Sequence, residues 1–139
     1  MANCVFCKIA KKEIAAEVIY EDNETIAFLD IHPRAQGHAI VVPKTHRENI
    51  LEAQNEELGP IFSAVKKVVS GISESISPDG FTIGINHGKF AGQEIDHLHI
   101  HIIPRFTGDG GRSIQSVADN KPSETIQETA SKIKKAINK

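Results

Sequence analysis

Tryptophan is absent from this chain of 139 residues, and only 5% of the residues are aromatic, so Leu, Ile and Val must form most of the core. The chain has no run of basic residues and carries a formal net charge of −2, which argues against a non-specific nucleic-acid surface. No apolar run approaches the length that spans a bilayer, and the first residues lack the features of a signal peptide. We therefore expect a cytoplasmic protein with no nucleic-acid partner and no membrane partner.

Cysteine is also scarce, because Cys4 and Cys7 are the only two. In a reducing compartment we do not expect them to form a structural disulfide. A Cys-x-x-Cys pair is half of a tetrahedral zinc site, and His46 and His97 are candidates for the other two ligands. The alternative is a pair of reduced thiols without metal.

The length and the ordinary hydrophobic fraction of 40% predict one domain with a sizeable core. Helical spacing of apolar residues predicts one long helix over 55–75, and a second stripe predicts a closing helix over 123–138. A short helical turn is expected at 9–14. Alternating or continuous apolar runs predict strands at 17–21, 25–30, 38–43 and 81–86, besides the histidine stretch at 97–105.

Residues 97–102 alternate histidine with Leu or Ile. In a strand, successive side chains point to opposite faces, so His97, His99 and His101 would lie in a row, with the aliphatic side chains on the other face. Packing alone is a poor explanation, because each imidazole has two nitrogens that need partners. Two readings remain from the residues alone: a metal site, or a nucleophile with groups that handle its protons. A loop with glycines at 87–93 precedes the row and favours an anion nearby.

The run His-φ-His-φ-His-φ-φ, with φ apolar, resembles the signature of the histidine-triad family of nucleotide-binding hydrolases and transferases. Other parts of the chain also resemble segments of this family, namely residues 4–9, 28–31, 37–46 and 86–93. The resemblance implies an α+β fold in which a five-stranded antiparallel sheet carries one long helix, with a homodimer that joins two sheets into ten strands. Residues 1–108 would form this domain, and 109–139 a loop and helix that extend it.

The resemblance also implies the chemistry. His99 would attack the α-phosphorus of a purine nucleotide to give a covalent nucleotidyl-histidine, which water hydrolyses. His101 would contact phosphate and assist the leaving group. His97 and His38 would orient His101 and relay protons. Asp30 would hold the ribose, and Asn86, Gly92 and Gln93 the phosphate. Apolar residues would wall the base pocket, namely Phe6, Ile9, Phe28, Leu29 and Ile31. No cofactor is required for this chemistry, and any zinc at Cys4, Cys7, His46 and His97 would be structural.

The preferred activity is hydrolysis of nucleoside 5′-phosphoramidates, as in the purine nucleoside phosphoramidase branch. Hydrolysis of diadenosine polyphosphates is a second possibility, since it would use the same triad. A nucleotide-binding module with little turnover is a third, because Glu94 places a carboxylate where phosphate is expected. A zinc-dependent hydrolase that uses the triad as ligands is a fourth.

Overall fold

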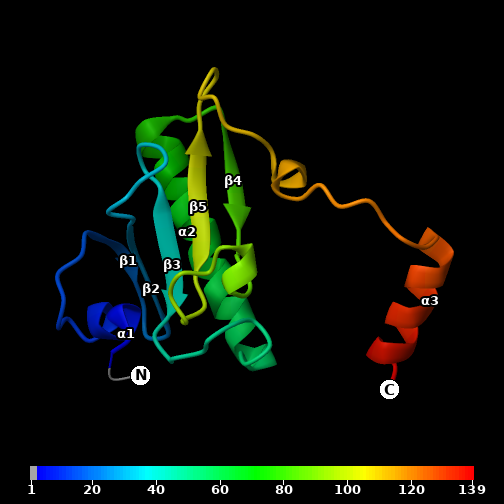
Figure 1. The fold of residues 1–139 in the computed structure, drawn as a ribbon. Helices are drawn as coiled ribbons and strands as arrows, with labels where there is room; N and C mark the ends of the chain where they lie inside the picture. Colours follow the sequence, from blue (N-terminus) through cyan, green and yellow to red (C-terminus); the bar gives the residue numbers. More distant parts are fainter. Residues whose placement is uncertain (1–2) are drawn as a thin grey trace.

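A five-stranded antiparallel sheet forms the centre of the computed structural model, which describes residues 3–139 and confirms the predicted α+β architecture (Figure 1). The strands lie in the order β1-β2-β3-β5-β4. Their bounds are Val18–Glu21 for β1, Thr25–Leu29 for β2, Ala39–Pro43 for β3, Gly80–Gly84 for β4 and Ile100–Arg105 for β5. The helices are α1 (Val5–Ala10), α2 (Asn55–Ile76) and α3 (Ile126–Ile137), with 3-10 turns η1 (Lys89–Ala91) and η2 (Ile114–Val117).

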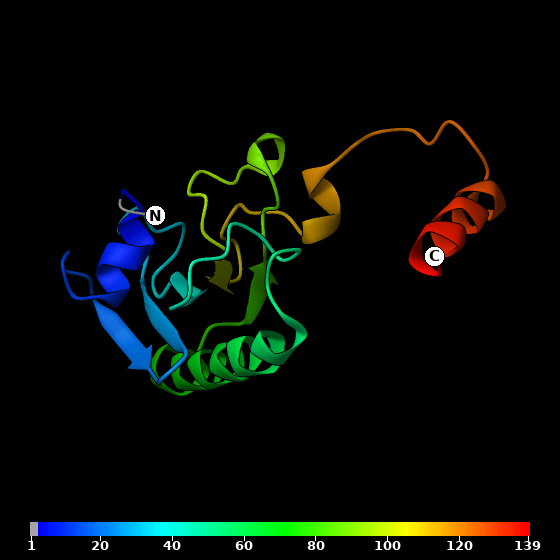
Figure 2. The same cartoon turned by 90° about the horizontal axis from the view of Figure 1, so that it is seen from below.

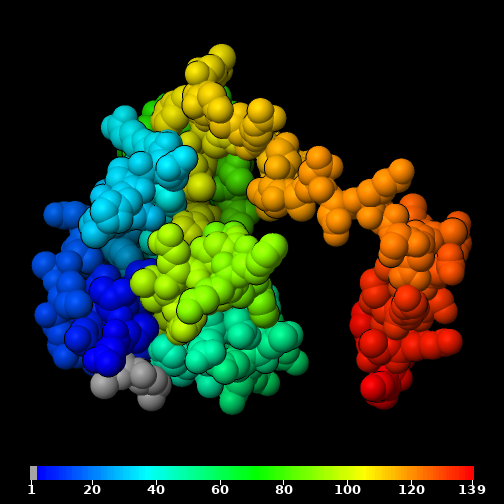
Figure 3. All heavy atoms as spheres, viewed as in Figure 1, coloured from blue at the N-terminus to red at the C-terminus, as the bar shows by residue number. Residues whose placement is uncertain are grey.

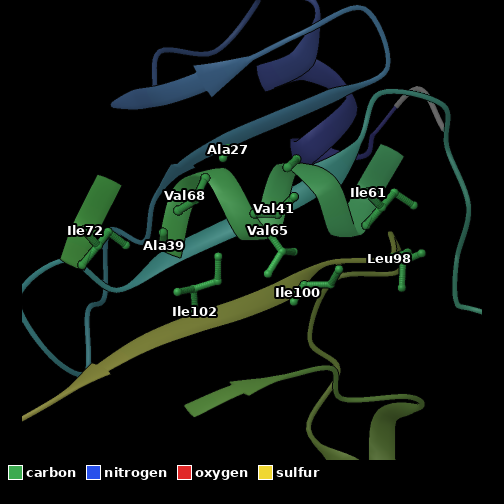
Figure 4. Packing of buried hydrophobic residues seen from close by; sticks show 11 residues of the cluster. Ala27, Ala39, Val41, Ile61, Val65, Val68, Ile72, Leu98, Ile100 and Ile102 are labelled. Carbon is green, nitrogen blue, oxygen red and sulfur yellow. The ribbon is translucent and has the colours of Figure 1, made fainter. Parts of the chain in front are cut away.

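The main core lies between the sheet and α2, the helix that the sequence predicts over 55–75. Its apolar stripe contributes Ile61, Val65 and Val68, which are almost fully buried. The sheet contributes the small residues of β2 and β3 and the aliphatic residues that alternate with the histidines. Figure 4 shows these residues facing α2, among them Ala27, Ala39, Val41, Leu98, Ile100 and Ile102.

The opposite face of the sheet carries a second apolar cluster beneath α1 (Figure 2). Phe6 and Ile9 of α1 pack there on Ile26 and Phe28 of β2. The helical turn expected at 9–14 is therefore wrong in position: the helix spans Val5–Ala10. Cys4 is its N-cap, and Phe6 and Ile9 are the residues that it buries, so packing fixes the helix earlier in the chain.

The histidine stretch keeps the predicted alternation but is only partly a regular strand. The strand β5 begins at Ile100, later than the predicted start at residue 97. Two of the three residues before it bond outside the sheet ladder: His97 N–H donates to the Ile95 carbonyl at 2.8 Å, and Leu98 N–H donates to the Arg47 carbonyl at 2.6 Å. Loop contacts thus replace strand pairing at this end, although Leu98 still faces the main core.

The C-terminal part leaves the body of the protein, residues 3–105, on the side of β4 (Figure 1). Residues 106–125 contain only the short turn η2, and α3 follows at their end. The predicted extension at 109–139 therefore contains the helix expected at 123–138, with bounds Ile126–Ile137. The domain boundary predicted at residue 108 stays a prediction, and residues 1 and 2 of that domain lie outside the described part. Within residues 3–139 no helix has the length and apolar character needed to cross a membrane.

The core predicts a large stability difference between two aliphatic truncations. Ile61→Ala removes a side chain that is 1% exposed, and should lower the free energy of unfolding by about 2–5 kcal/mol through lost burial and the cavity left behind. Leu51→Ala is the control, because Leu51 is 82% exposed and should change stability by less than about 0.5 kcal/mol. Urea unfolding followed by circular dichroism at one protein concentration measures both. Equal effects of the two substitutions would contradict this description of the core.

Candidate functional site

Four imidazoles lie on the sheet face opposite α2, along β5 and the neighbouring start of β3. The ring centroids of His99 and His101 are 5.1 Å apart, and those of His101 and His38 are 5.2 Å apart. His97 lies further back, with the ring of Phe6 against both it and His99 at 5.9 and 5.1 Å. The structure therefore brings the predicted triad and His38 together, with Phe6 packed against the rings of both His97 and His99.

The ring of His99 is oriented by the protein backbone. Its Nδ1 lies 2.7 Å from the carbonyl oxygen of His97, which can only accept a hydrogen bond. The ring proton therefore sits on Nδ1, and Nε2 keeps its lone pair. The side chain is 6% exposed, so the lone pair lies in a shielded position. A neutral imidazole with a fixed free lone pair is the form that a nucleophile requires.

A backbone donor sets the tautomers of His38 and His101. The backbone N–H of Arg34 donates to Nδ1 of His38 at 3.1 Å, so neutral His38 carries its proton on Nε2. That Nε2 lies 3.0 Å from Nδ1 of His101 and donates to it. His101 then carries its own proton on Nε2, which makes this atom a hydrogen-bond donor at the site.

Burial favours the neutral forms of His38, His97 and His101 near pH 7. Desolvation, with smaller effects from the neighbouring imidazoles, lowers the pKa of His101 to about 4. Desolvation also lowers the pKa of His38, against an opposing effect of Asp30. The pKa of His97 is lowered to about 4, again mainly by burial. These shifts agree with the tautomers above, which require neutral rings.

Asp30 reaches the same group of side chains from the end of β2. Its Oδ2 lies 3.6 Å from Nε2 of His38, and its Oδ1 accepts a hydrogen bond from the N–H of His32 at 2.8 Å. One carboxylate oxygen thus stabilises the loop after β2, while the other faces the imidazoles. The ligand atoms of Asp30, His38 and His101 lie within 4.8 Å of one another.

The predicted phosphate loop is assembled next to η1. Gly92 has φ +109°, and a Cβ there would lie 3.3 Å from Nδ2 of Asn86, so the Asn86 side chain lies close to the Gly92 backbone. Gln93 has a different position from the one expected of a phosphate ligand. Its buried amide accepts from Gly88 N–H at 2.9 Å and donates to the carbonyls of Glu48 and Ile95 at 2.7 and 3.1 Å. Its side chain therefore holds the loop together.

The expected base pocket is only partly assembled on this face. Phe6, Ile9 and Phe28 pack in one buried cluster there. Leu29 corrects the expectation, because strand alternation turns it to the other face, where it packs against the main core. Ile31 lies beyond the strand and is 83% exposed, so it is free to contact a ligand from the loop.

A separate cluster joins the N-terminus to the start of the histidine stretch. The ligand atoms of Cys4, Cys7, His46 and His97 all lie within 4.8 Å of one another. Nδ1 of His97 lies 3.4 Å from Sγ of Cys4 and 3.5 Å from Sγ of Cys7, and Nδ1 of His46 lies 3.3 Å from Sγ of Cys7. Bonds of about 2.3 Å to sulfur and 2.0 Å to nitrogen give a tetrahedral edge of roughly 3.5 Å.

The donor chemistry of this cluster also fits zinc. Nε2 of His97 donates to the carbonyl oxygen of Pro43 at 2.8 Å, so Nδ1 is left as a lone pair that faces the two thiols. Such a carbonyl partner on the outer nitrogen is the usual support of a metal-ligating histidine. Two thiols and two imidazoles complete a set of four ligands.

A backbone carbonyl that fixes the tautomer of His99 is expected from the chemistry, but sequence reasoning does not identify the residues that supply the three backbone groups bonded to the rings. They are the N–H of Arg34 and the carbonyls of Pro43 and His97. The side chains at these positions give no signal, because any residue supplies a carbonyl and nearly any residue an N–H. Only the fold brings these groups to the imidazoles.

Comparison with known proteins gives one consistent result. The HIT domain family matches residues 11–108. An uncharacterised HIT-like protein of Methanocaldococcus jannaschii is 50% identical over 107 residues, which cover 77% of this chain and 82% of that protein. An adenosine 5′-monophosphoramidase of Schizosaccharomyces pombe is 40% identical over 103 residues, 74% of each chain.

Solved structures match nearly the whole chain. A HIT family protein of Bacillus subtilis is similar with a TM-score of 0.85 and 39% identity, over 96% of each chain. A HIT family protein of Bacillus anthracis gives a TM-score of 0.84 at 36% identity, over 98% of this chain and 95% of that one. The similarity therefore includes the C-terminal extension as well as the sheet.

The lowered pKa of His101 predicts how stability depends on pH. Unfolding returns the ring to its ordinary pKa near 6.5, so below that pH the unfolded chain binds the extra proton. The free energy of unfolding should therefore fall as the pH is lowered from 7 towards 4, and His101→Gln should lose less stability over this interval than the unsubstituted protein. Urea unfolding at several pH values measures the difference.

His87→Gln is the matched control, because it changes an exposed histidine in the loop before η1. It should keep the pH dependence of the unsubstituted protein. If His101→Gln also kept it, the assignment of a buried neutral ring to His101 would be wrong.

Proposed function

Because this chain belongs to the HIT domain family, we propose that it is a nucleotidyl hydrolase that cleaves purine nucleoside 5′-phosphoramidates through a covalent intermediate on His99. The main support is the imidazole of His99, whose Nδ1–H is held by the His97 carbonyl so that Nε2 is free to attack phosphorus. Relatives named adenosine 5′-monophosphoramidase, at 38–40% identity, support the substrate class.

The reaction has two steps. First, Nε2 of His99 forms a bond to the α-phosphorus, and the bond between phosphorus and the leaving nitrogen breaks. Nε2–H of His101 would donate a hydrogen bond to the leaving nitrogen. This nitrogen would take the proton that it gains from solvent water, so that neutral His101 keeps its own proton. Water then breaks the bond between phosphorus and His99, releases the nucleoside monophosphate and gives up one proton, so the two steps balance.

The remaining contacts follow from the positions of the other groups. Oδ2 of Asp30 would accept from a ribose hydroxyl, since Oδ1 is already engaged with His32. Asn86 and the backbone around Gly92 would contact the phosphate oxygens, while Gln93 holds the loop in place. The apolar cluster of Phe6, Ile9 and Phe28, with Ile31 from the loop, would contact the base.

We also propose that Cys4, Cys7, His46 and His97 hold a structural zinc ion. Their donor types and spacing support this assignment. In this role His97 supports the catalytic row through its carbonyl, while its ring stays with the metal. The ion would hold α1 close to His46, in the segment before α2, and to His97, in the segment before β5. It would take no part in the reaction.

A homodimer is the proposed assembly. The strand β4 is an edge strand, with one side unpaired in a single chain. Pairing of β4 with β4 of a second copy would join two five-stranded sheets into ten strands and cover the β4 edge of each sheet.

The covalent step can be observed directly. Brief mixing with adenosine 5′-phosphoramidate, followed by acid quenching and mass spectrometry, should show one added adenylyl group located on His99. His99→Ala should show no adduct and should lose at least about 10³-fold in kcat, because no other ring has its geometry. His87→Ala is the matched control and should keep the adduct. An adduct on another residue, or turnover by His99→Ala, would contradict the mechanism.

The same experiment separates the alternative activities. A diadenosine polyphosphate that gives the adduct faster than the phosphoramidate would favour the polyphosphate hydrolase. Binding of nucleotide without any adduct would favour a nucleotide-binding module.

Removal of zinc should affect stability and spare the chemistry. A chelator, or Cys7→Ser, should remove the metal measured by elemental analysis and lower Tm by about 5 °C or more. Adduct formation below the new Tm should persist. Loss of the adduct on chelation, at a temperature where the protein stays folded, would show instead that the metal takes part in the reaction.

A further inference from the structure

The helix α3 has an apolar face that the body of the protein does not cover. Ile126, Ala130, Ile133 and Ile137 lie at intervals of four and three residues, which places them on one stripe. Ile126, Ile133 and Ile137 are 83%, 52% and 74% exposed, and none of the residues of α3 is buried. Lys132, Lys134 and Lys135 lie off this stripe.

An amphipathic helix of 12 residues needs a partner. Isolated helices of this length are marginal in water, although the capping box of Thr125 and Glu128 helps this one to start. Figures 1 and 2 both place α3 well away from the sheet, and Figure 3 shows open space between it and the body. The partner is therefore not residues 3–105 of the same chain in this arrangement.

The space beneath α3 lies beside the unpaired edge of the sheet. β4 forms that edge, and Ile83 on it is 39% exposed. The turn η2 lies beside this edge, because a Cβ built on Gly84 would be 3.7 Å from Cδ1 of Ile114. Val117, at the end of η2, is 82% exposed. The chain thus passes the sheet edge, adds apolar surface there and then carries α3 outward.

We propose that the C-terminal arm, residues 106–139, docks on a second copy of this chain and that two copies exchange their arms. A copy that pairs along β4 would occupy the space between the sheet edge and α3. The stripe of Ile126, Ile133 and Ile137 would then lie on that copy, and the two-fold axis would place the partner's arm on the first chain in the same way. The inference rests on the proposed homodimer and adds to it the exchange of α3.

The arm is also included in the match to a crystal structure. The Bacillus anthracis protein matches 98% of this chain with a TM-score of 0.84, so its alignment extends through the arm. The arm is therefore part of the shared architecture. Burial of three isoleucines on a partner would supply the apolar contact that α3 lacks in a single chain.

A photo-crosslinking residue at Ile133 tests the exchange in the full-length protein. We would substitute p-benzoylphenylalanine there, mix equal amounts of ¹⁴N- and ¹⁵N-labelled protein, allow subunits to exchange, and irradiate. The expected product has the mass of a dimer, and its crosslinked peptides contain both isotopes. The same substitution at Lys135, on the opposite face of α3, is the matched control and should crosslink at least about tenfold less.

Light scattering of the unirradiated protein keeps the possible failures apart. A dimer whose crosslinks from Ile133 all join residues of one chain, or a dimer without crosslinks, would overturn arm exchange while leaving the dimer in place. A monomer would overturn both. The adduct on His99 is measured separately, so neither result changes the proposed chemistry.

A second set of variants measures the energy of the contact. Ile126→Ser, Ile133→Ser and Ile137→Ser combined should raise the dimer dissociation constant by about tenfold or more, since three apolar side chains lose their partner surface. Lys135→Ser should leave the constant unchanged. An unchanged constant in the triple variant would also overturn the proposal.

Discussion

The alternation of residues 97–102 is the constraint on which both sides of the sheet depend. Leu98, Ile100 and Ile102 are almost fully buried against α2, and this burial fixes which way the stretch faces. A shift by one residue would move the histidines into the main core and the aliphatic residues out of it, at a cost of several buried side chains. The hydrophobic core thus determines the direction of the three imidazoles of residues 97–101.

Direction alone does not determine the chemistry of an imidazole, because either nitrogen can carry the proton. Backbone groups make that choice here. The His97 carbonyl keeps the proton of His99 on Nδ1, and the Arg34 N–H, acting through His38, keeps that of His101 on Nε2. Neighbouring rings of the same type therefore have opposite tautomers, one that presents a lone pair and one that presents a donor.

The sequence predicts much of the fold because its patterns are strong. The stripe of α2, the apolar β3 and the alternation before Pro104 identify their elements correctly. The errors occur where tertiary contacts override the pattern. α1 was expected too late in the chain because Phe6 and Ile9 gain their burial from β2 and β3, which the local sequence does not show.

The candidate site was also predictable in part from the sequence. The residue types at 38, 97, 99 and 101 indicated the site, and the structure brings the four histidines onto one face. The exact role of Gln93 was not predictable, since an amide before the triad suits either a phosphate contact or a loop brace. In the structure its side-chain amide makes three hydrogen bonds, to Gly88, Glu48 and Ile95, and these bonds hold the loop together. The prediction for Leu29 is wrong because it places Phe28 and Leu29 in the same pocket. Strand alternation turns these two neighbours to opposite faces of the sheet.

His97 links the two clusters and explains why they are adjacent. Its ring lies with Cys4, Cys7 and His46, while its carbonyl accepts from the ring of His99. Any movement of α1 that displaced the two thiols would also act on the position of His97, and through its carbonyl on the proton of His99. Phe6 adds a second connection, since it lies between the two cysteines in sequence and packs against the rings of His97 and His99. The N-terminal helix therefore helps to determine the state of an imidazole more than 90 residues later in the chain.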